Sequence, residues 1–229
     1  MPLRSPPAAV LFDMDGLLLD SERIALAIMA ECAAEIGLDW APQVGMRMIG
    51  RNVVDANRVL RDHYGDDARL SLLPGAFRAR YDRHIDEGAI PLKPGVTTLL
   101  DLLEHHAIPR AVATSTQRER ASRKLARNDL LHRFDALIGG DEVERGKPAP
   151  DIYLAAANAI GVEPARCLVL EDSNTGARAG LAAGMTVIMV PDLLEPDAAV
   201  LALGARSMNS LLDVAGTLEP LLEDETTPP

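Results

Sequence analysis

Short apolar runs alternate with helix-forming segments along most of this 229-residue chain, and this alternation restricts its fold more than any other feature. We expect strands at about 8–12, 110–114, 135–138, 167–170, 185–190 and, weakly, 205–207. We expect the helices between and after them at about 96–106, 117–127, 151–160, 175–183 and 210–222. Such strands are joined by βαβ crossovers, which make neighbouring strands parallel. The sequence therefore predicts an α/β fold with a mainly parallel sheet.

One long segment breaks this alternation. Between the first and second expected strands the chain carries helical patterns and no strand pattern; they lie at about 22–36, 42–48, 53–64 and 71–87. The Pro-Leu-Lys-Pro-Gly sequence that follows is typical of a linker. We therefore predict an all-helical domain of residues 21–91 inserted into a core of residues 1–20 and 92–229.

Composition argues against several classes of partner. The chain has 23 Lys and Arg against 34 Asp and Glu, and aromatic residues make up 3%, which disfavours nucleic acid and anionic membranes. It has no apolar stretch of about 20 residues and no apolar signal-like N-terminus. Cys32 and Cys167 suggest neither a disulfide framework nor a zinc site. We expect a cytoplasmic protein, a monomer or weak dimer, without nucleic-acid or membrane partners.

The first apolar run, Val10–Phe12, ends in two acids, Asp13 and Asp15, with Gly16 directly after them. The glycine indicates a sharp turn at the carboxyl end of a buried strand, where open α/β sheets bind ligands. Two carboxylates this close repel each other, so we expect a cation or a shared proton between them. The alternative is that both acids only form the turn and cap the next helix, which is the commoner case for a lone Asp-x-Asp.

Polar side chains also follow other expected strands. Thr114 and Ser115 follow the second, Glu171 and Asp172 follow the fourth, and Lys147 lies in a proline-rich loop between them. Each has a simpler interpretation as a helix cap or a solvated lysine. The carboxyl ends of parallel strands share one edge of a sheet, however, so residues about 160 positions apart would meet there. If each of these residues had only a structural role, we would not expect all of them to be placed along the strand ends in this order.

This mixture of groups suits phosphoryl chemistry. Clustered carboxylate oxygens favour a hard cation, above all Mg²⁺. Hydroxyl and backbone donors near Thr114 can hold phosphate oxygens, and Lys147 can neutralise charge. A carboxylate nucleophile beside a second carboxyl group is what an aspartyl-phosphate route requires.

Taken together, these motifs resemble the signature of the haloacid dehalogenase-like (HAD) superfamily. The likeness covers residues 10 to about 191 and consists of Asp13-Met-Asp-Gly, Thr114, Lys147 in Gly-Lys-Pro-Ala-Pro-Asp, and Glu171-Asp-Ser. The continuation of the first motif, Leu-Leu-Leu-Asp-Ser-Glu, is similar to the phosphatase and β-phosphoglucomutase branch. In that branch the core is Rossmann-like, and the helical segment would be a mobile cap over it.

The resemblance implies a role for each motif residue. Asp13 would attack phosphorus and become an aspartyl-phosphate, and Asp15 would act as general acid to the leaving oxygen and then as base for water. Thr114 and the amide of Ser115 would hold the phosphoryl group. Lys147 would orient the nucleophile and offset charge. These roles agree with the alignment and charge neutralisation that phosphoryl transfer needs.

The resemblance also implies a magnesium site. Mg²⁺ would be held by the side chains of Asp13 and Asp172 and by the backbone carbonyl of Asp15, with Glu171 outside the ligand set or reaching the ion through water. The dehalogenases of the family lack the second acid, because a halide leaves without a proton. Asp15 therefore favours phosphate chemistry over dehalogenation.

The substrate should be chosen by the cap, whose loops close over the leaving group. Arg47, Arg51 and Asn52 follow the first cap helices, and Arg51 is our candidate for an anionic substrate group, with a plain surface arginine as the alternative. β-Phosphoglucomutases of this branch usually carry a histidine in the first cap helix, where Ala25 and its neighbours offer none. We therefore expect a phosphatase for a small sugar or organic phosphate; a phosphotransferase or a non-catalytic binding protein are the alternatives.

Overall fold

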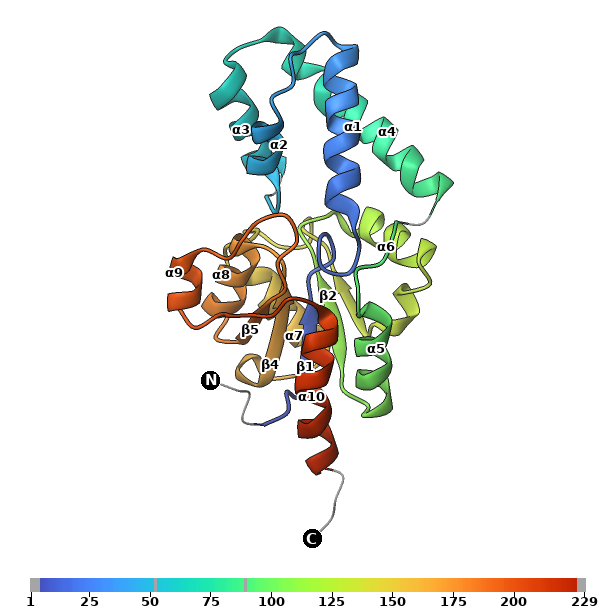
Figure 1. The fold of residues 1–229 in the computed structure, drawn as a ribbon, viewed down its shortest axis with the longest axis vertical. Helices are drawn as coiled ribbons and strands as arrows, with labels where there is room; N and C mark the ends of the chain where they lie inside the picture. Colours follow the sequence, from blue (N-terminus) through green and yellow to red (C-terminus); the bar gives the residue numbers. More distant parts are fainter. Residues whose placement is uncertain (1–4, 52, 89, 226–229) are drawn as a thin grey trace.

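A six-stranded parallel sheet forms the centre of the protein (Figure 1). The computed structural model describes residues 5–51, 53–88 and 90–225. Its strands are β1 (Ala9–Phe12), β2 (Arg110–Ala113), β3 (Ala136–Ile138), β4 (Cys167–Glu171), β5 (Thr186–Met189) and β6 (Arg206–Ser207). Their order is β3-β2-β1-β4-β5-β6, and every recorded strand pair is parallel. The predicted α/β fold is confirmed, and the order reverses direction between β1 and β4, where such sheets bind ligands.

Helices cover both faces of the sheet. They are α5 (Val96–His105), α6 (Arg118–Arg127), α7 (Asp151–Ala159), α8 (Asn174–Ala182), α9 (Ala198–Ala202) and α10 (Leu211–Glu225). Strand side chains alternate between two apolar clusters: Val10 and Phe12 pack with residues of α5, α6 and α10, whereas Ala9 and Leu11 pack with residues of α7 and α8. The strands are therefore buried on both sides, as the unbroken apolar runs indicate. The short helix α9 was not predicted.

Four further helices stand beyond the carboxyl edge of the sheet (Figure 1). They are α1 (Ser21–Glu35), α2 (Pro42–Met48), α3 (Val53–Tyr64) and α4 (Leu73–Glu87), with a short 3₁₀ helix at Ala68–Ser71. Helix α4 packs on α6, where Arg120 and Arg123 form ion pairs with Asp82. The helices lie where the sequence places them, while their division into a separate domain of residues 21–91 stays a prediction. Within the described part of the chain, no helix combines the length and apolarity needed to cross a bilayer.

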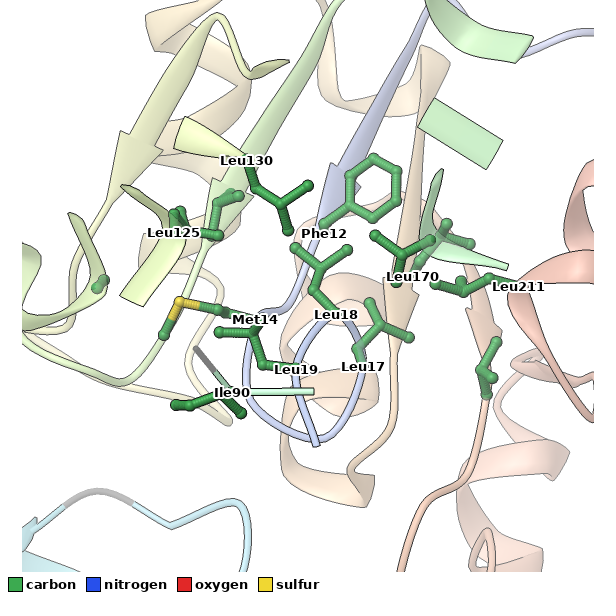
Figure 2. Packing of buried hydrophobic residues seen from close by; sticks show 14 of the residues in the cluster. Phe12, Met14, Leu17, Leu18, Leu19, Ile90, Leu125, Leu130, Leu170 and Leu211 are labelled. Atoms are coloured by element: carbon green, nitrogen blue, oxygen red, sulfur yellow. The ribbon is translucent and has the colours of Figure 1, made fainter. Parts of the chain in front are cut away.

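A tight turn joins β1 to α1 and fixes the first motif. The Gly16 amide donates to the carbonyl of Leu19 (2.9 Å), and the Leu18 amide donates to that of Met14 (3.0 Å). Leu17, Leu18 and Leu19 are buried, and Figure 2 shows Leu17 and Leu18 beside Phe12 and Leu170 of the core. This turn is anchored by its own apolar side chains, so the two aspartates before and within it are held rigidly.

Candidate active site

Asp13 lies at the carboxyl end of β1, in the position where the sheet order reverses. Its amide donates to the carbonyl of Leu170 (3.0 Å), which continues the β1–β4 ladder by one residue. The residue is 7% exposed, and its Oδ1 accepts a hydrogen bond from Lys147 Nζ at 2.5 Å. Burial raises the pKa of Asp13 to about 7, an effect opposed by Lys147 and reinforced by the charge of Glu171.

Glu171, the last residue of β4, holds Lys147 in place. Lys147 Nζ donates to Glu171 Oε1 (2.5 Å), and the Tyr153 hydroxyl donates to the same oxygen (2.6 Å). The amide and hydroxyl of Ser173 donate to Oε2 (3.1 and 2.9 Å). Burial alone would lower the pKa of Lys147, but Asp13 and Glu171 outweigh it and raise that pKa above its usual value. Both Glu171 oxygens are thus engaged by protein donors.

Asp172 has the opposite environment. Its side chain is buried, yet its carboxylate accepts no hydrogen bond from any residue that the structure describes. Burial, followed by the charges of Asp13 and Glu171, raises the pKa of Asp172 well above its usual value. The carboxylate lies against the backbone of Gly16, where an added Cβ would stand 2.3 Å from Oδ2 and where φ is +85°. Only glycine fits this position without displacing Asp172.

The donor set at this edge fits a hard divalent cation. Carboxylate oxygens of Asp13, Glu171 and Asp172 lie within 4.8 Å of one another, and Lys147 is the single ammonium that contacts two of them among the described residues. The excess negative charge, and an Asp172 carboxylate that no described residue hydrogen-bonds, match an oxygen-seeking ion. Because the Glu171 oxygens are already engaged, Asp13 and Asp172 are the better ligands of the three.

Asp15 is held by a separate set of donors. Ser21 Oγ and Lys124 Nζ donate to its Oδ1 (2.5 and 2.6 Å), and Thr116 Oγ1 donates to Oδ2 (2.7 Å). Burial would raise the pKa of Asp15, but the charge of Lys124 and these hydrogen bonds outweigh it and lower the pKa. The Lys124 side chain is 3% exposed and lies 4.9 Å from the ring centroid of Tyr81 in α4. Asp15 is therefore ionised in this arrangement.

The motif residues line one cavity of about 550 Å³ between the sheet edge and helices α1 to α4. Its floor is formed by Asp13, Asp15, Thr114, Ser115, Lys147 and Asp172. The structure thus brings together the core residues singled out above, and each of them lines the cavity except Glu171, which hydrogen-bonds Lys147 from behind.

The cap residues named from the sequence differ in whether they line the cavity. Arg51 lines the cavity, although its Nε donates to the carbonyl of Arg47 (2.7 Å) and its side chain is exposed. Arg47 is not among the lining residues, and Asn52 lies outside the described residues. Ala25 lines the cavity in the helix where a mutase would carry its histidine.

Several residues of the site were missed by the sequence analysis: Ser21, Glu22, Thr116, Lys124 and Tyr153. Glu22 lines the cavity, and burial, followed by the charges of Asp15 and Asp13, raises its pKa to about 8. A signal existed for Lys124, because it falls on the buried stripe of α6 with Ala121 and Leu125. A lysine on an apolar stripe requires a charged partner.

The family model and the relatives of this chain indicate a phosphoric monoester hydrolase. A family model described as haloacid dehalogenase-like hydrolase matches residues 10–190, and the chain belongs to this family. The resemblance drawn from the sequence motifs is thereby confirmed.

Three known proteins illustrate the similarity. A bifunctional riboflavin kinase/FMN phosphatase of Arabidopsis thaliana is 32% identical over 93% of this chain, which spans 55% of that protein's length. A phosphorylated carbohydrates phosphatase of Thermotoga maritima is 30% identical over 93% of this chain and 99% of its own. The crystal structure of CbbY from Rhodobacter sphaeroides with xylulose-1,5-bisphosphate superposes with a TM-score of 0.75 at 26% identity, covering 93% and 99% of the two chains.

Proposed function

We propose that this protein is a Mg²⁺-dependent phosphatase that hydrolyses a small phosphorylated metabolite through an aspartyl-phosphate intermediate. The observation that carries the proposal is the meeting of Asp13 and Asp172 with Lys147 and Thr114 at the floor of one cavity. The relatives support it, because they include an FMN phosphatase and a phosphorylated carbohydrates phosphatase. We propose residues 21–91 as the cap and residues 1–20 and 92–229 as the core.

The chemistry has two steps. In the first, a carboxylate oxygen of Asp13 forms a bond to phosphorus while the bond to the substrate oxygen breaks, and Asp15 gives that oxygen a proton. In the second, water attacks the phosphoryl group, Asp15 takes its proton, and the Asp13 carboxylate is regenerated as phosphate leaves. Thr114 and the Ser115 amide hold phosphoryl oxygens, and Lys147 keeps the nucleophile aligned.

We propose that the metal ligands are the side chains of Asp13 and Asp172 and the backbone carbonyl of Asp15. When bound, the ion supplies charge neutralisation for the phosphoryl oxygens and the crowded acids. Glu171 serves instead to hold Lys147, because Tyr153 and Ser173 occupy its remaining acceptor sites. A location in the cytoplasm and a monomer or weak dimer stay predictions.

Removal of the metal is expected to weaken the fold in a pH-dependent way. Without the ion, burial raises the folded-state pKa of Asp13 to about 7, so its favourable contribution is complete only at low pH and is lost as pH rises through that value. Added Mg²⁺ should therefore raise the melting temperature more at about pH 8 than at about pH 6. Thermal unfolding of chelator-treated protein with and without Mg²⁺ measures this. Asp172→Asn should lose most of the shift and Asp129→Asn should keep it; an equal shift in both would contradict the assigned site.

A panel of phosphate monoesters, with free phosphate as the readout, tests the function itself. We expect phosphate release that requires Mg²⁺ and stops on chelation. Phosphorus NMR of the products separates hydrolysis from return of the phosphoryl group to another hydroxyl, which is the β-phosphoglucomutase-like alternative. Transfer without release would replace the phosphatase by that alternative, and no turnover of any phosphate ester would favour a non-catalytic binding protein.

A further inference from the structure

The cavity above the acids is polar at its floor and mostly apolar in its walls. The walls come from α1 to α4 and the loops between them, and their apolar residues include Leu26, Met29, Met48, Ile49, Ala56, Leu60, Leu73, Phe77 and Tyr81. A phosphate group would occupy the floor, where Lys147 and Thr114 lie. The rest of the substrate must then face the apolar walls.

From these walls we infer that the substrate is the phosphate ester of an alcohol that carries a ring with apolar faces, rather than an open polyol or a sugar. This inference rests on the proposed phosphatase function and names its substrate class. The hydroxyls of a sugar need partners once they leave water, and the apolar part of the walls offers none. A ring instead gains from burying its faces against the same walls.

An aromatic pair in α4 favours a flat ring in particular. The rings of Phe77 and Tyr81 are stacked, with centroids 5.2 Å apart and planes inclined by 14°, and both residues line the cavity. Tyr81 is buried, whereas Phe77 is partly exposed. Met29 and Met48 add polarisable thioethers to the lining. Aromatic faces and thioether sulfurs both attract aromatic rings beyond their simple area.

Polar residues also line the cavity above its floor, among them Glu22, Arg51, Asn57, Arg78, Gln117 and Arg120. The Asn57 amide lines the cavity and meets no hydrogen-bond partner among the described residues. Arg78 also lines it, with a side chain that is 66% exposed. Asn57 and Arg78 could contact a carbonyl or nitrogen at the edge of a ring. A volume of about 550 Å³ also exceeds what a phosphate with a three-carbon alcohol would fill.

The test compares esters of similar primary alcohols, so that leaving-group chemistry is matched. We expect kcat/KM for 2-phenylethyl phosphate to exceed that for glucose 6-phosphate and glycerol 3-phosphate by about 10-fold or more, with hexyl phosphate between them. A sugar or glycerol phosphate hydrolysed as well as the ring ester would overturn the inference. Equal rates for the hexyl and phenylethyl esters would overturn its aromatic part.

Acetyl phosphate separates this inference from the function on which it rests, because its acetyl group is too small to reach the cavity walls. No hydrolysis of acetyl phosphate would count against the phosphatase itself, whereas its hydrolysis together with a sugar preference would count only against the ring substrate.

Wall variants give an independent readout. Phe77→Ala should lower the ratio of kcat/KM for 2-phenylethyl phosphate to that for acetyl phosphate by about 10-fold, mainly through KM. Leu72→Ala is the matched control, since Leu72 is exposed and lies outside the cavity lining. If Phe77→Ala melts early, Ala56→Phe, which fills the cavity from α3, should produce the same fall. An unchanged ratio in a folded wall variant would contradict the inference.

Discussion

Asp13→Asn is expected to lower kcat for every phosphate ester by about 10⁴-fold or more, to the level of a metal-assisted background. An amide nitrogen or oxygen is too weak a nucleophile to replace the carboxylate that Lys147 holds at 2.5 Å. The variant also loses one of the two acidic partners of that lysine, while Glu171 keeps the ammonium in place. Steady-state phosphate release measures the loss.

The control for this experiment is Asp129→Asn, the same change at a side chain that is 96% exposed. Asp129 has φ of +54°, a conformation that asparagine also adopts. It should keep full activity. Intact-mass measurement must show that the amide introduced by Asp13→Asn has not deamidated back to a carboxylate. Normal turnover by an intact Asp13→Asn variant would remove Asp13 as the nucleophile.

Asp15→Asn should show the second-largest effect, and that effect should depend on the leaving group. For an alkyl phosphate, which needs a proton on its departing oxygen, we expect a fall of about 10²- to 10⁴-fold in the first step. For p-nitrophenyl phosphate the first step should survive, because nitrophenolate leaves without a proton. Water attack still lacks its base, so a burst of nitrophenolate should precede slow turnover, and phosphorylated protein should accumulate.

Rapid-quench kinetics and intact mass would measure the burst and the covalent adduct. A loss of equal size for both leaving groups, without a burst, would show that Asp15 is not the acid.

In the wild-type protein Asp15 must act first as an acid and then as a base. Lys124 lowers the pKa of Asp15, which suits the base half of the cycle but opposes the acid half. Lys124 lines the same cavity, so an anionic substrate can pair with its ammonium. This pairing weakens the effect of Lys124 on the pKa of Asp15 and allows Asp15 to take up a proton.

The sequence was sufficient for the central strands because each of them is a local apolar run that ends in a polar turn. Val10–Phe12 and Cys167–Leu170 are buried on both faces, and parallel topology then brings Asp13 beside Asp172. The element boundaries agreed to within a few residues because caps, glycines and prolines mark them. The helix α9 escaped, since its five residues are too few to show a helical period.

The supporting contacts of the site could not be predicted in the same way. Tyr153 reaches Glu171 from α7, and Lys124 reaches Asp15 from α6, through crossings that depend on tertiary packing. Arg51, the cap candidate from the sequence, lines the cavity, whereas Arg47 in the last turn of α2 does not. Local patterns indicate which residues end strands, but not which distant side chains hold them.

Thr175 Oγ1 donates to the carbonyl of Gly50 (3.0 Å), and a Cβ at Gly50 would stand 2.8 Å from the Cβ of Ser173. Ser173 in turn donates a hydrogen bond to Glu171, which accepts another from Lys147. The contact between the cap and the core at Gly50 thus lies next to the hydrogen bonds that hold the nucleophile Asp13 in place. Closure of the cavity and alignment of the Asp13 carboxylate are therefore mechanically coupled. A bulky residue in place of Gly50 would disturb, through these side chains, the position of the oxygen that attacks phosphorus.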